Sequence, residues 1–114
     1  MAKSQRLARI EGEMQRALSE LISRGVKDPR VGSVTITDVK VLADMSAARV
    51  FFTPFASKHP ADEVREGLTS AAAYLRGEVG RRLRLRHAPR LEFVFDDSFE
   101  KAAKLTALID SAPK

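Results

Sequence analysis

The apolar residues of this chain change their spacing along its length, from a helical period to a strand period and back. From about Ser4 to Ser23 they recur at three- and four-residue steps, whereas Val34–Val41 and Ala47–Thr53 alternate apolar and polar residues. The helical spacing returns from Pro60 to Leu83, and Leu91–Phe95 alternates again. Both periods within 114 residues predict one α+β domain, with amphipathic helices packed on a small sheet.

The first half of the chain predicts a helix followed by a β-hairpin. Gly25 suits the end of the helix, and Lys27-Asp28-Pro29-Arg30 predicts a turn because proline cannot continue a helix. The strand alternation changes parity near Thr37–Asp38, which indicates a β-bulge. The short link Ala43–Ser46 favours antiparallel pairing of the two strands.

The second half predicts a long helical stretch and a third strand. Each of the interior glycines Gly67, Gly77 and Gly80 weakens a helix by roughly 1 kcal/mol relative to alanine. We therefore expect a break or kink, although the apolar spacing does not locate it. His87-Ala88-Pro89 is expected to end the helix, which gives the order α-β-β-α-α-β and a three-stranded sheet.

The end of the chain predicts a weaker element. Asp96-Asp97-Ser98 has the composition of a turn and a helix N-cap, and Ala102, Leu105 and Leu108 follow at helical spacing. We expect a single domain with its core at about residues 4–97, and a C-terminal helix or flexible tail at 98–114.

Positive charge is concentrated in Arg76–Arg90, which holds six arginines and one glutamate, Glu78. The local charge of +5 equals the net charge of the whole chain, so the other residues balance. Displacing condensed counterions from a phosphate backbone favours binding to such a patch. Together with a pI near 10.0, the pattern predicts a nucleic-acid partner.

Residues that commonly carry catalysis or bind cofactors are scarce. Cysteine is absent, and His59 and His87 each lie in a proline-containing loop without metal-ligand spacing. The glycine-rich motifs that hold phosphates or dinucleotides are missing. We predict a protein that is not an enzyme and has no catalytic, cofactor or metal site.

The chain also lacks the sequence marks of a membrane or secreted protein. It has no tract of about 18 or more apolar residues and no apolar signal-peptide core. We expect a soluble cytoplasmic monomer.

Gly77-Glu78-Val79-Gly80 matches the GxxG pattern with which KH domains hold nucleotides. A working GxxG loop should separate two helices and offer small or basic residues to the phosphates. Here the pattern carries a glutamate and falls late in the helical stretch, so we interpret it as incidental.

Several pieces of the sequence, taken in order, resemble the ribosome-binding factor A family of bacterial small-subunit maturation factors. The resemblance covers roughly Arg6 to Leu108. Its pieces are Lys27-Asp28-Pro29-Arg30 before the first strand, Asp44 before Ala48-Arg49-Val50, and the run of Leu75-Arg76, Gly80, Leu83-Arg84-Leu85-Arg86, Pro89, Leu91, Phe93 and Asp96-Asp97-Ser98.

This resemblance implies a KH type II-like domain without a functional GxxG loop. In the family a helix-kink-helix replaces that loop, with an Ala-x-Gly sequence at the kink. The motif falls on Ala71-Ala72-Ala73, where alanine replaces the family glycine. Because alanine is a strong helix former, we expect either a shallower kink or one held by Ser70 and tertiary packing.

The resemblance also implies a function. The family binds free 30S subunits, assists late small-subunit maturation and processing of the 16S rRNA 5′ end, and matters in the cold. The implied partners are the 30S subunit and 16S rRNA, with assembly GTPases as further candidates. The residues expected to bind RNA are Arg76, Arg81, Arg82, Arg84 and Arg86, with Lys27, Arg30 and Lys58 as lesser candidates.

Two alternatives stay open at the level of sequence. One is a generic KH-like RNA-binding module without ribosome specificity. The other is a small DNA-binding protein, although the chain shows no recognisable helix-turn-helix.

Overall fold

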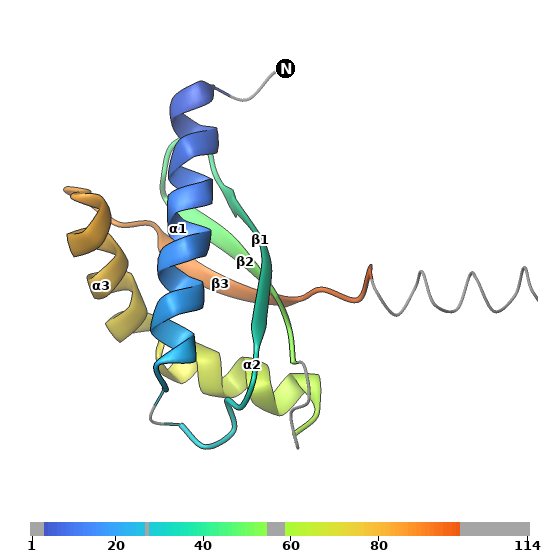
Figure 1. Ribbon diagram of the computed structural model, residues 1–114. Coiled ribbons are helices and arrows are strands. Elements are labelled where there is room, and N and C mark those ends of the chain that lie inside the picture. The colour runs from blue at the N-terminus through green and yellow to red at the C-terminus, as the bar shows by residue number, and fades with distance from the viewer. Residues whose placement is uncertain (1–3, 27, 55–58, 99–114) are drawn as a thin grey trace, which may run out of the picture.

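Helices and strands follow one another in the predicted order. The computed structural model describes residues 4–26, 28–54 and 59–98. Its elements are α1 (Gln5–Ser23), β1 (Thr35–Val41), β2 (Ala47–Thr53), α2 (Ala61–Ser70), α3 (Ala72–Leu83) and β3 (Arg90–Phe95) (Figure 1). The α+β class is confirmed. The helix expected after Ser98 lies outside the described residues, and none of the described helices is long and apolar enough to cross a membrane.

The sheet has three strands in the order β1-β2-β3, with β2 at its centre. β1 and β2 pair antiparallel, and their register shifts between Ile36 and Asp38, which confirms the predicted hairpin and bulge. β3 pairs parallel to β2, with Ala48 opposite Leu91 and Val50 opposite Phe93. A parallel pair needs a crossover connection, and the two helices α2 and α3 supply it.

The core lies between the helices and one face of the sheet. Ala48, Val50 and Phe52 of the central strand are fully buried, and they meet Met14 and Leu18 of α1 in one apolar cluster. Figure 1 shows α1 lying across the sheet, and α1 packs against both β1 and α3. Alternation along β2 therefore directs its apolar residues to the helices, as the sequence predicts.

A single residue, Ala71, separates α2 from α3. Its φ of −89° and ψ of −2° depart from helical values, and the two helices run in different directions (Figure 1). The break thus falls at the first of the three alanines and at none of the glycines. Ser70 Oγ accepts a hydrogen bond of 3.3 Å from Arg30 Nη2, and Gly67 packs against the 28–31 turn. These contacts favour the alternative in which Ser70 and tertiary packing hold the kink.

The helical spacing ends at Leu83, as α3 does, but the stop signal expected at His87-Ala88-Pro89 lies several residues beyond the end of the helix. α3 ends at Leu83, and Arg84 adopts a left-handed conformation with φ 55° and ψ 43°. Leu85 N donates to Gly80 O at 2.9 Å, which closes the helix in the manner of a Schellman motif. Glycine is the usual residue at such a position. Because arginine occupies it here, the sequence carries no stop signal before His87-Ala88-Pro89.

Candidate nucleic-acid interface

A shallow groove with a volume of about 560 Å³ runs along α3 and the turn that follows it. We call it the α3 groove. Its basic residues are Arg76, Arg81, Arg84, Arg86 and His87, and the small residues among them are Ala73, Gly77, Gly80 and Ala88. Steps of four and three residues place positions 73, 77 and 80 on one face of the helix. The groove therefore combines positive charge with a surface that a chain can approach closely.

The backbone at the end of α3 brings helix and turn arginines to the same groove. The left-handed Arg84 ends the helix, so that Arg86 follows on a turn beside it. Such a conformation costs a non-glycine residue about 1–3 kcal/mol, and strained positions of this kind cluster at functional sites. Arg76 Nε donates to Ala88 O at 2.9 Å, which ties α3 to the turn before β3. Arg81 is paired with Glu78, so the one acid of the run partly neutralises the charge of this arginine.

Arg82 lies apart from the groove. Its Nη1 is 3.1 Å from Glu20 Oε2 of α1, and 29% of its side chain is exposed. The arginines of Arg76–Arg90 therefore do not form one continuous surface. Four of the five principal candidates line the α3 groove, whereas Arg82 joins α3 to α1.

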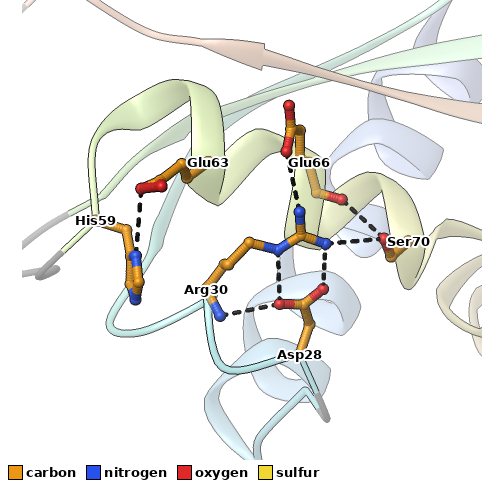
Figure 2. Close-up of polar contacts among 6 residues, drawn as sticks. All are labelled: Asp28, Arg30, His59, Glu63, Glu66 and Ser70. Carbon is orange, nitrogen blue, oxygen red and sulfur yellow. Dashed lines mark hydrogen bonds and ion pairs between the residues drawn. The ribbon is translucent and has the colours of Figure 1, made fainter.

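Arg30 belongs to a separate ion-pair cluster, which we call the Arg30 clamp (Figure 2). Its Nε donates to Asp28 Oδ1 at 2.9 Å and its Nη1 to Glu66 Oε2 at 3.0 Å. The Arg30 side chain, and next its backbone N–H, lower the pKa of Asp28 to about 2. The clamp joins the 28–31 turn to α2, and two carboxylates share one guanidinium. The remaining candidates, Lys27 and Lys58, lie outside the described residues.

The Arg30 clamp predicts a loss of stability in acid. Asp28 has an ordinary pKa of 3.8 and a folded pKa of about 2, so its contribution is complete above about pH 4 and is lost as pH falls towards 2. Urea unfolding at pH 5, 3 and 2 should show this loss. Asp28→Asn should lower stability at pH 5 and flatten the dependence below pH 4. The pKa values of Asp44 and Asp96 are also lowered, and these two groups contribute the same pH dependence of stability to the wild type and to Asp28→Asn. A variant with an unchanged pH profile would exclude Asp28 as the titrating group.

Sequence reasoning missed part of this surface. Gly77-Glu78-Val79-Gly80 lies inside α3 and not between helices, so it is not a KH GxxG loop, as the sequence indicated. Its two glycines nevertheless line the α3 groove, as does His87. The spacing of Ala73, Gly77 and Gly80 on one helix face was the available signal. Among the described residues no group of three or more His, Cys, Asp or Glu could hold a metal ion.

Comparison with protein families gives one match over nearly the whole chain. The family model described as "Ribosome-binding factor A" matches residues 6–109. A ribosome-binding factor A from Thioalkalivibrio sulfidiphilus is 49% identical over 107 residues, covering 94% of this chain and 83% of the relative. One from Pseudomonas putida is 48% identical over 116 residues, covering 98% of this chain and 87% of the relative.

Solved structures agree with these sequence matches. The crystal structure of ribosome-binding factor A from Thermus thermophilus has a TM-score of 0.68 and 32% identity, covering 77% of this chain and 93% of that one. A homology model of the Thermus thermophilus factor, fitted into the cryo-electron microscopy map of a 30S complex, has a TM-score of 0.64 and 29% identity. It covers 78% of this chain and 93% of that one.

Proposed function

The chain belongs to the ribosome-binding factor A family, and from this we propose that it binds the small ribosomal subunit through the α3 groove. The similar Thermus thermophilus factor has been fitted into a map of its complex with the 30S subunit. On this chain, the observation that carries the proposal is the meeting of four arginines with a glycine-containing helix face.

The chemistry of the α3 groove suits ribosomal RNA. Guanidinium groups pair with phosphates in a bidentate manner and stack on unpaired bases, which irregular RNA offers more than duplex DNA does. The bare position at Gly77 lets a sugar-phosphate backbone come close to α3. A generic RNA-binding module would share these features, so selectivity for the 30S particle is the property to test.

The further steps of the proposal follow from the family. The protein acts without catalysis, as a cytoplasmic monomer, in late small-subunit maturation and processing of the 16S rRNA 5′ end, with its greatest importance in the cold. Assembly GTPases are candidate partners in its release. The number and place of the arginines in the α3 groove support the binding step of this proposal.

Sedimentation with ribosomal particles tests the proposed function. The protein should co-sediment with free 30S subunits more than with 70S ribosomes. If all four groove arginines contact phosphates, log Kd should rise with log salt concentration at a slope of about 3–4. Equal binding to any single-stranded RNA would support the generic module instead. Tight binding to duplex DNA without 30S binding would contradict the proposal.

A further inference from the structure

A second hollow, separate from the α3 groove, lies at the break between α2 and α3. We call it the kink cavity; its volume is about 470 Å³, and none of the residues that line it lines the groove. It lies between the segment after α1 and the helix break, and its lining residues are Gly25, Val26, Asp28, Ser70, Ala71 and Tyr74.

Tyr74 gives the kink cavity an exposed aromatic wall. Its relative exposure is 60%, and it is the only tyrosine of a chain without tryptophan. Tyr74, Gly77 and Arg81 are spaced by three and four residues, so they share one face of α3. A strand whose phosphates lie in the α3 groove can therefore extend a base towards Tyr74. Aromatic side chains of this kind stack on unpaired bases.

Asp28, which also lines the kink cavity, brings a hydrogen-bond acceptor to it. Its Oδ1 accepts from both the backbone N and the Nε of Arg30, and its Oδ2 accepts from Nη2. A carboxylate has about four acceptor positions, and the described residues fill three of them, so Oδ2 retains one with respect to that part of the chain. Its low pKa keeps the group ionised at neutral pH. An ionised acceptor attracts N–H donors and repels carbonyl oxygens.

Guanine fits this arrangement better than uracil does. Its edge presents two adjacent donors, N1–H and the N2 amino group. Uracil has a single N–H that lies between two carbonyl groups, which the Asp28 carboxylate would repel. A purine also offers more area to an aromatic ring than a pyrimidine does.

We propose that the kink cavity binds an unpaired guanine of RNA, stacked on Tyr74 with its N–H edge towards Asp28. This inference rests on the proposed function, because the α3 groove holds the strand that carries the base. It adds a base-specific contact to a surface whose phosphate pairing and arginine stacking do not depend on base identity.

The lone tyrosine makes the test direct, because intrinsic fluorescence then reports on the kink cavity alone. Tyrosine emission is titrated with the pentanucleotides UUGUU, UUIUU and UUUUU, with free tyrosine amide as the control for absorption by the RNA. All three carry the same phosphates. UUGUU should quench Tyr74 and bind about fivefold to tenfold more tightly than UUUUU, while inosine, which lacks the N2 amino group, falls between them.

Variants at Tyr74 complete the test, with dye-labelled RNA and anisotropy as the readout. Tyr74→Leu should weaken UUGUU binding about tenfold and abolish the preference over UUUUU, whereas Tyr74→Phe should keep both. Equal affinity for the three RNAs, or a preference that survives in Tyr74→Leu, would overturn the inference. Sedimentation of the wild-type protein with 30S subunits separates the two proposals. Intact 30S binding without a guanine effect removes only this inference, whereas loss of both removes the proposed function.

Discussion

Replacing Arg81 and Arg84 together with glutamine is expected to weaken binding to 30S subunits by about 10- to 100-fold. Both side chains line the α3 groove, and each can form a charge-assisted hydrogen bond with a phosphate. The slope of log Kd against log salt should fall by about 1.5–2, because two fewer counterions are released. Affinity for 30S subunits measured at several salt concentrations checks both numbers.

A second double variant separates the contribution of the α3 groove to 30S binding from the contribution of net charge. Arg82→Gln with Arg90→Gln removes the same two charges, but Arg82 faces Glu20 of α1 and Arg90 is 3.5 Å from Glu92. We expect a loss of only a few-fold in 30S affinity. Since exposed ion pairs contribute about 0–1 kcal/mol, both doubles should stay folded. Equal losses in the two doubles would show that net charge, and not the α3 groove, directs binding.

The course of the backbone was largely predictable from the sequence, because apolar periodicity reports which face of each element is buried. The strands and the bulge follow from alternation, and the short link Ala43–Ser46 predicts the antiparallel hairpin. The residue that terminates α3 was not predictable in this way. The conformation of Arg84 depends on how the turn closes, and an arginine at a left-handed position carries no local signal.

The candidate site was predictable in composition but not in arrangement. The sequence places Arg82 and Arg84 two residues apart, and both were expected to contact RNA. In the structure the helix ends between them, so one faces α1 and the other the groove. Arg30 shows the same limit, since its carboxylate partner Glu66 is 36 positions away in the chain. Pairings of this kind depend on tertiary packing, which a charge pattern does not record.

Gly67 and Gly77 form a matched pair, because both are interior helix glycines that the sequence could not distinguish. Alanine at either position gains about 1 kcal/mol of helix propensity. A Cβ at Gly77 would meet nothing within 4 Å. One at Gly67 would lie 2.6 Å from Val31 Cγ2 and 3.3 Å from Arg30 Cβ. Val31 is β-branched and stiff, and Arg30 Cβ is next to the backbone, so neither can easily move aside.

The same substitution should therefore have opposite effects on the free energy of unfolding. Gly77→Ala should raise it by up to about 1 kcal/mol, whereas Gly67→Ala should lower it by about 1–2 kcal/mol, because overpacking outweighs the helix gain. Urea unfolding of the two variants measures the difference. Similar stabilities would contradict close packing of α2 on the 28–31 turn.

Gly77→Ala should also bind 30S subunits a few-fold more weakly despite its greater stability, because the added methyl group lies in the α3 groove and holds the RNA backbone away from α3. A variant that is more stable and binds less well would link Gly77 to recognition rather than to folding.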